Sequence, residues 1–173
     1  MSTGTAVKAP FTFFYLTDNV WSTNYSYDFW NINFTNAANV DNSAIIKTIY
    51  DPSISGFTLP KTAAFTNFTS TGAEVSNANL YNVDGGMVSG FYFYTKEWRK
   101  GETIFWHAFG TRDIWSGRSG TGNVTGFATE GHYWVAGAAS SITGRALHFN
   151  INRICPQYTN GRSYGNVLWL VKE

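Results

Sequence analysis

The sequence predicts a single β-dominated α+β domain, residues 1–173, with long loops and little helix. Short runs of aromatic and β-branched residues, which favour strands, alternate with stretches of Gly, Ser, Thr and Asn, which favour turns and loops. Only one segment carries the signals of a helix. A chain of 173 residues is also long enough to bury about two-thirds of its unfolded surface as one domain.

Two strands and a long loop are predicted before residue 52. Residues 11–16 (FTFFYL) form an aromatic strand candidate, and residues 44–50 (AIIKTIY) form a β-branched one that Asp51-Pro52 ends. Residues 17–44 have no helical period and are expected to form a long ordered loop. Four aromatic residues are expected to hold this loop in place, namely Trp21, Tyr27, Phe29 and Trp30.

A helix and a hairpin are predicted in the middle of the chain. Pro60 suits the first turn of a helix, which we expect over residues 61–68. The clearest hairpin pairs residues 87–95 (MVSGFYFYT) with residues 102–109 (ETIFWHAF). Both runs are rich in β-formers, and the charged turn 96–101 lies between them.

The last third of the chain combines a skeleton of apolar runs with irregularly placed polar and aromatic residues. The skeleton comprises residues 132–135, 146–149, 153–156 and 167–171. Four apolar side chains at skeleton positions are expected in the core: Trp134, Leu147, Phe149 and Val171. Trp115, Tyr158 and Tyr164 lie in polar surroundings instead, as aromatic anchors of a binding surface do.

Composition and chemistry exclude several functions. With 13% charged residues and a net charge of +1, the chain lacks the electrostatics of a nucleic-acid or anionic-membrane binder. It has no apolar run of membrane-spanning length, so no membrane insertion is expected, and its start does not resemble a signal peptide. A single cysteine, Cys155, excludes an internal disulfide and a multi-thiolate metal site.

No catalytic residue, metal site or cofactor is predicted. His107, His132 and His148 do not pair with one another or with a carboxylate at helical spacing, so ordinary structural histidines are the favoured interpretation. Cys155 has no evident His or Asn partner and is expected to be inert. Aspartates in the loops leave a carbohydrate-active enzyme as a less favoured alternative, because sequence cannot place two carboxylates at a catalytic separation.

Motifs from about residue 44 to the end follow, in order and spacing, those of a known family. They are YDP at 50–52, GFTLP at 56–60, FTNFTSTG at 65–72, FGTR at 109–112, GHYW at 131–134, LHF at 147–149, ICP at 154–156, RSYG at 162–165 and LWLV at 168–171. These resemble the fibrobacter succinogenes major paralogous domains of Bacteroidetes, in the formylglycine-generating-enzyme-like branch of the C-type lectin fold. Residues 1–43 would then be an N-terminal strand and loop of the same domain.

The chain departs from the family pattern in two places. Ser53 stands where the family's first motif usually has Cys, and the final LWLV lacks the usual Arg and Pro, which changes the packing expected of the last strand. The family's oxidases use two active cysteines. With only Cys155 present, the resemblance does not imply oxidase activity.

Many such domains resemble the variable proteins of diversity-generating retroelements, which are found on phage tail fibres and bacterial surfaces. There, errors at template adenines turn Asn codons into codons for many residues, and the residues in the corresponding slots here can all arise in that way. The resemblance therefore implies a receptor-binding module with a diversified C-terminal surface, at the tip of a phage tail fibre or in a bacterial surface adhesin.

The expected localisation is the virion, or the extracellular space and cell surface. The expected partner is a cell-surface protein or glycan, and a homotrimer within a larger fibre fits such a position. A structural subunit, fimbrial or virion-decorating, is the alternative. The residues expected to bind the ligand are Trp115, His132, His148, Ile151, Arg153, Tyr158, Asn160, Tyr164 and Asn166.

Overall fold

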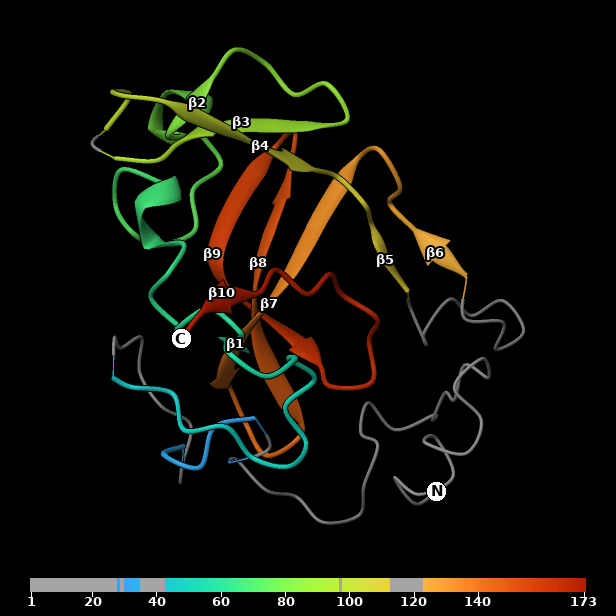
Figure 1. Ribbon diagram of the computed structural model, residues 1–173. Helices are drawn as coiled ribbons and strands as arrows, with labels where there is room; N and C mark the ends of the chain where they lie inside the picture. The colour runs from blue at the N-terminus through green and yellow to red at the C-terminus, as the bar shows by residue number, and fades with distance from the viewer. Residues whose placement is uncertain (1–27, 29, 35–42, 97, 113–122) are drawn as a thin grey trace.

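The computed structural model describes residue 28 and residues 30–34, 43–96, 98–112 and 123–173. Over these residues the fold is dominated by β-strands and has almost no helix (Figure 1). Within the same residues no helix has the length and apolar character needed to cross a membrane. The predicted strand 11–16, most of the loop 17–44, and Trp115 lie outside the described residues.

A central antiparallel sheet is formed by the skeleton segments of the last third. It comprises β7 (Glu130–Ala138), β8 (Thr143–Asn150) and β9 (Arg153–Gly161), in the order β7-β8-β9. These long strands run through the middle of the molecule (Figure 1). The turn between β8 and β9 is closed by Asn150, whose Oδ1 accepts hydrogen bonds from the backbone N–H groups of Asn152 and Arg153 at 2.9 and 3.0 Å.

The predicted hairpin is confirmed as part of a second sheet. β3 (Gly90–Tyr94) pairs with β4 (Thr103–His107), and β2 (Val83–Asp84) adds to the other side of β3. This sheet lies across one end of the molecule (Figure 1). The Tyr133 hydroxyl donates a hydrogen bond of 2.6 Å to the His107 carbonyl and so ties the central sheet to it.

Two short strand pairs lie beside these sheets. β5 (Thr111–Arg112) pairs with β6 (Val124–Thr125), and β1 (Phe57–Thr58) pairs with β10 (Val171–Lys172). The prediction that Val171 lies in the core is wrong. Its side chain is 37% exposed, because β10 pairs only with the two-residue β1 at the surface.

The predicted helix over residues 61–68 is also wrong, apart from its last turn. Only the short 3₁₀ helices η1 (Thr66–Phe68) and η2 (Ala78–Leu80) are present among the described residues. In the first of these regions the buried side chains are Thr62, Phe65 and Phe68. These residues are three apart, the spacing at which side chains eclipse one another in 3₁₀ winding.

The predicted strand 44–50 is reduced to one isolated bridge, between Lys47 and Asn31. The Asn31 side-chain oxygen accepts a hydrogen bond from the Ile46 backbone N–H at 3.0 Å, in place of a ladder bond from a neighbouring strand. The side chains of Ile46 and Ile49 are exposed. The apolar run therefore lacks the buried face that a strand of this composition needs.

Apolar clusters cover both faces of the central sheet. Tyr133 and Phe149 point into the larger cluster, which also takes in residues of β3 and β4 and the stacked rings of Phe68 and Phe93, 3.9 Å apart. Trp134 points to the opposite face and packs in a smaller cluster. The core predictions for Trp134, Leu147 and Phe149 are confirmed, since each is at most 3% exposed. Burying side chains of this size contributes about 1.5–3 kcal/mol each.

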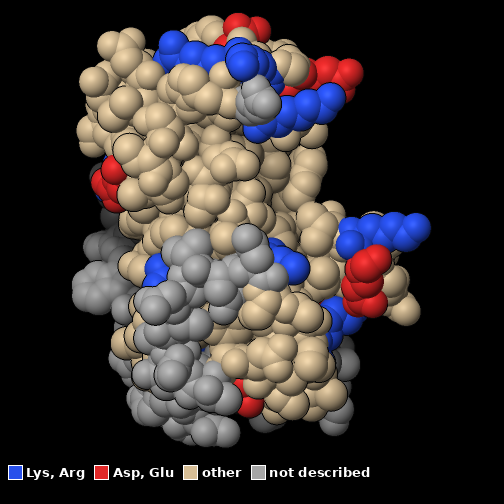
Figure 2. Space-filling view, turned by 90° about the vertical axis from the view of Figure 1, so that its left-hand side faces the viewer, with Lys and Arg blue, Asp and Glu red and all other residues tan. Residues whose placement is uncertain are grey.

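Charged side chains gather away from this core. Lys and Arg residues gather with acidic ones at one end of the molecule, others lie further down, and the broad face between them has few charges (Figure 2). Lys96, Arg99 and Lys100 are exposed in the charged turn that was predicted between the two strands of the hairpin.

Candidate functional site

The candidate site lies on the same face of the central sheet as Trp134, at the end where β7 begins. Side chains alternate along a strand, so Glu130 and His132 share this face with Trp134. The register of the sheet pairs His132 with His148 across β7 and β8, and His148 with Cys155 across β8 and β9. An apolar sheet face thus ends in a group of polar residues.

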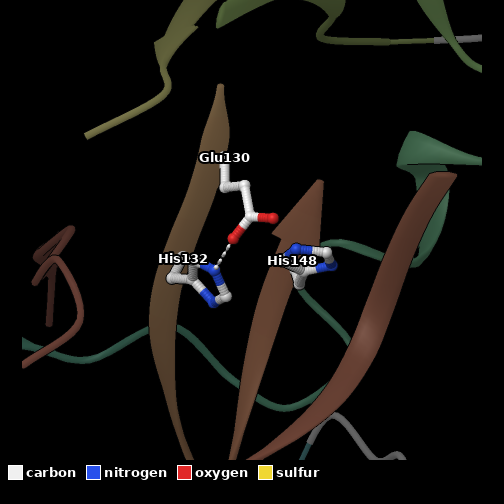
Figure 3. A group of neighbouring side chains, drawn as sticks. All are labelled: Glu130, His132 and His148. Carbon is white, nitrogen blue, oxygen red and sulfur yellow. Dashed lines mark hydrogen bonds and ion pairs between the residues drawn. The ribbon is translucent and has the colours of Figure 1, made fainter. Parts of the chain in front are cut away.

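Three of these residues, Glu130, His132 and His148, form what we call the histidine cluster. The imidazole ring centroids are 4.5 Å apart, and His132 Nε2 lies 3.3 Å from Glu130 Oε2. The Glu130 carboxylate points toward both imidazoles (Figure 3). One potential ligand atom from each of the three residues lies within 4.8 Å of the other two. This donor set can hold a metal ion.

The backbone holds Glu130 firmly at the start of β7. Its N–H donates a hydrogen bond to the Gly126 carbonyl, and its carbonyl accepts one from the Gly110 N–H, both at 2.7 Å. Gly110 has φ of +73°, and a Cβ there would collide with the backbone near Thr125. Glycine is required at this close approach of two backbones.

His148 is kept neutral by its surroundings. It is 2% exposed, and desolvation by this burial lowers its pKa to about 3, with smaller contributions in the same direction from His132 and Arg153. Loss of hydration disfavours the charged imidazolium, and electrostatic repulsion from the basic neighbours His132 and Arg153 adds to that effect. The ring is therefore an uncharged imidazole at neutral pH.

Tyr158 and Arg153 extend the site toward solvent along β9. The Tyr158 ring lies 4.8 Å from the His148 ring, and the Arg153 guanidinium carbon lies 5.4 Å from the centre of the Tyr158 ring, within the range of a cation–π contact. Arg153 also forms an ion pair with Glu74 at 3.4 Å. Both Arg153 and Tyr158 are half-buried, and Ile151, in the adjoining turn, is 67% exposed.

Two of the predicted binding residues serve as an internal link instead. Asn166 Oδ1 accepts hydrogen bonds from Thr111 Oγ1 at 2.6 Å and from Asn160 Nδ2 at 3.3 Å. All three side chains are buried. The bonds join β9, β5 and the segment before β10.

The structure therefore divides the predicted site residues into groups. The Arg153 guanidinium contacts the Tyr158 ring on β9, and the exposed Ile151 lies in the adjoining β8–β9 turn. Tyr164 is half-buried against the smaller apolar cluster. Four residues expected to face a ligand are instead at least 91% buried: His132, His148, Asn160 and Asn166. The first three lie in the central sheet, both faces of which are covered. Trp115 lies outside the described residues.

Neither Glu130 nor the convergence of the two histidines was predicted from the sequence. The histidines do not follow helical spacing, and the spacing that brings them together is that of strands. Glu130 and His132 are two residues apart on one strand, and His148 is the cross-strand neighbour of His132. The alternation of residues along β7 indicates that Glu130 and His132 share a face. Placing His148 beside them also requires the register between β7 and β8, which the sequence does not give.

An exposed aromatic stripe was also missed. Tyr92 lies 4.8 Å from Phe105, and His107 stacks on Phe109 at 4.4 Å and lies 6.1 Å from Phe127. The side chains of Tyr92, Phe109 and Phe127 are 50%, 47% and 64% exposed. The stripe runs along the outer face of β3 and β4 and continues past the end of β4. Its signal in the sequence was the alternation of residues 105, 107 and 109.

Cys155 does not have the surroundings of a reactive thiol. It is 6% exposed, and burial, followed by its contact with Glu74, raises the pKa of its thiol to about 11. A neutral thiol is a poor nucleophile. This environment suits the inert role expected from the sequence.

Comparison with known proteins adds no assignment: no family model, curated protein or solved structure matches the chain. The resemblance to the C-type lectin family therefore rests on the motifs alone.

Proposed function

We propose that this protein is a receptor-binding module of the C-type-lectin-like class, carried on a phage tail fibre or a bacterial surface adhesin. Its partner would be a protein or glycan on a cell surface, bound without chemical change. The binding surface comprises Ile151 in the β8–β9 turn and Arg153 and Tyr158 on β9, with Tyr164 in the following loop as a secondary element.

The observation that carries this proposal is the pairing of Arg153 with Tyr158 beside the exposed Ile151. Arginine and tyrosine are enriched among the residues that dominate binding energy at interfaces. Contacts with Tyr158 and Glu74 already restrict the Arg153 side chain, so less conformational entropy is lost when a ligand binds. Both residues belong to β9, which pairs with β8 on either side of an irregularity between Cys155 and Tyr158, and this pairing gives them a defined position.

The placement of the family motifs is in keeping with a diversified surface. The segments 131–134, 147–149 and 154–156 fall on β7, β8 and β9, where they contribute to the covered parts of the sheet. Ile151, Arg153 and Tyr158 stand between or after these segments and retain access to solvent. Substitutions at these three positions would change the recognised surface while leaving the main apolar clusters in place.

The test is binding of the purified protein to intact gut Bacteroidetes cells. We expect Arg153→Ala and Tyr158→Ala each to weaken binding by at least tenfold, in line with the loss of an interface anchor. Tyr92→Ala is the matched control, because it removes a half-exposed tyrosine from the other sheet. Circular dichroism and thermal unfolding would establish that every variant is folded. Unchanged binding by the two β9 variants would contradict the proposal.

A second candidate function is that of a structural subunit, and the aromatic stripe favours it. A stripe containing Tyr92, Phe109 and Phe127 exposes apolar surface that a neighbouring subunit could bury. If this is the function, the wild-type protein will self-associate in sedimentation equilibrium and Phe127→Ser will reduce that association. Cell binding lost in Tyr92→Ala but retained in Tyr158→Ala would instead place the receptor site on the stripe.

A further inference from the structure

We propose that Glu130, His132 and His148 form a binding site for one Zn²⁺ ion. The proposal is independent of receptor binding, because it concerns the occupancy of the histidine cluster and not what the outer surface recognises. Two imidazoles and one carboxylate are a donor set that zinc accepts in proteins.

The spacing of the donors is close to that of zinc ligands. With bonds of about 2.0–2.2 Å, two ligand atoms of a tetrahedral zinc ion are about 3.3 Å apart. Glu130 Oε2 and His132 Nε2 are already separated by 3.3 Å. All three donors lie within 4.8 Å of one another, so His148 requires a shift of no more than about 1.5 Å to reach the same ion.

The scaffold fixes the side chains that would bind the ion. His132 and His148 are register partners in the central sheet. Glu130 is anchored through both its backbone N–H and its carbonyl. A metal site built on paired strands needs little ordering when the ion enters.

A second observation at the same place also calls for a ligand. His148 is 98% buried, and its Nδ1 is enclosed without a hydrogen-bond partner among the described residues. A buried polar atom without a partner is uncommon in folded proteins and costs stability. Coordination to a Zn²⁺ ion would give this buried imidazole a bonding partner.

The cluster is enclosed on the histidine side and open on the glutamate side. The His132 and Glu130 side chains are 6% and 38% exposed, respectively. Solvent can therefore reach the carboxylate, which provides a route for the ion. Three protein ligands leave the fourth position of a tetrahedral zinc ion to water.

The decisive measurement is isothermal titration calorimetry of the tag-free, chelator-treated full chain with Zn²⁺. We expect one ion to bind per chain, and we expect Co²⁺ to give the visible absorption spectrum of a four-coordinate site. Glu130→Gln keeps the size of the side chain and removes its charge, and His148→Phe keeps a buried ring and removes the nitrogens. Each should weaken Zn²⁺ binding by at least tenfold.

His107→Gln is the matched control, because it removes a half-buried histidine outside the cluster. It should leave the Zn²⁺ affinity unchanged. Absence of one-to-one binding by the wild-type chain would overturn the proposal, as would undiminished binding by folded Glu130→Gln and His148→Phe. Loss of zinc binding with retained cell binding would separate this site from the receptor surface.

Discussion

His132 and His148 face each other across β7 and β8 with their ring centroids 4.5 Å apart, and both are buried. The register of the sheet creates this pair, and Glu130 joins it through the two-residue repeat of β7. This buried pair of polar side chains is therefore part of the sheet itself. The residues accessible to a receptor lie beside it, toward the β8–β9 turn.

The burial of His148 makes the stability of the metal-free protein dependent on pH. The imidazole has a pKa of about 3 in the folded state, against an ordinary value of 6.5. Below pH 6.5 the unfolded chain takes up a proton that the folded chain does not. The contribution of His148 to the free energy of unfolding is therefore fully present above pH 6.5 and is progressively lost as the pH falls toward 3. At pH 5 this group should lower the free energy of unfolding by about 2 kcal/mol.

Urea unfolding at pH 7.5 and pH 5, with chelator present, measures this effect. The groups around His148 are His132, Glu130, Arg153, Tyr158 and Cys155, so the comparison needs a variant that changes His148 alone. His148→Phe should lose less stability than wild type between the two pH values. An identical loss in both proteins would show that His148 does not carry the dependence.

Phe149 and Ile151 have opposite roles although only one residue separates them. Phe149 is fully buried and contacts the rings of Phe91 and Phe93, whereas Ile151 is 67% exposed. Phe149→Ala should reduce the free energy of unfolding by about 3–5 kcal/mol, and Ile151→Ala should change it by less than about 0.5 kcal/mol. Chemical denaturation of the two variants gives both values, and similar losses would contradict the assignment.

Gly131 allows close packing of β7 against β8. A Cβ at this position would collide with the ring of Phe149. Gly131→Ala should therefore destabilise the protein by about 1–3 kcal/mol through overpacking. Gly86→Ala is the control, because a Cβ at that position meets no other atom and its φ is ordinary. Equal thermal midpoints for the two variants would argue against this packing.

The Cys155 thiol should be unreactive in the folded protein. It is buried, and its pKa is raised to about 11. Ellman's reagent at pH 8 should label the native protein much more slowly than the urea-unfolded protein, in which the thiol is exposed. Rapid labelling of the native protein would show that the thiol is accessible.

The parts of the fold that could be predicted are those that local patterns determine. The runs 87–95 and 102–109 contain alternating β-formers on both sides of a polar turn, which is sufficient to define a hairpin. Ile46 and Ile49 have equally strong β propensity, yet their segment gains only one bridge. Propensity cannot show whether a partner strand is present, since that depends on tertiary structure.

The candidate site was less predictable because it depends on register. Tyr158 was predicted from its polar surroundings, and Ile151 and Arg153 from the family resemblance. The structure brings Arg153 and Tyr158 into contact. Asn160 and Asn166 have equally polar neighbours, but their side chains are buried and form a hydrogen bond with each other. Which face a strand residue occupies changes with a shift of one position, so sequence alone could not separate these two groups.

The most direct test of a binding surface on a fixed scaffold is a displayed library in which Ile151, Arg153 and Tyr158 are randomised together. The library would be sorted first for resistance to protease and then for binding to a panel of bacterial cells. We predict that most variants remain folded and that sorted variants bind cells that the wild type does not. General loss of protease resistance, or cell binding unchanged across the folded variants, would contradict this account.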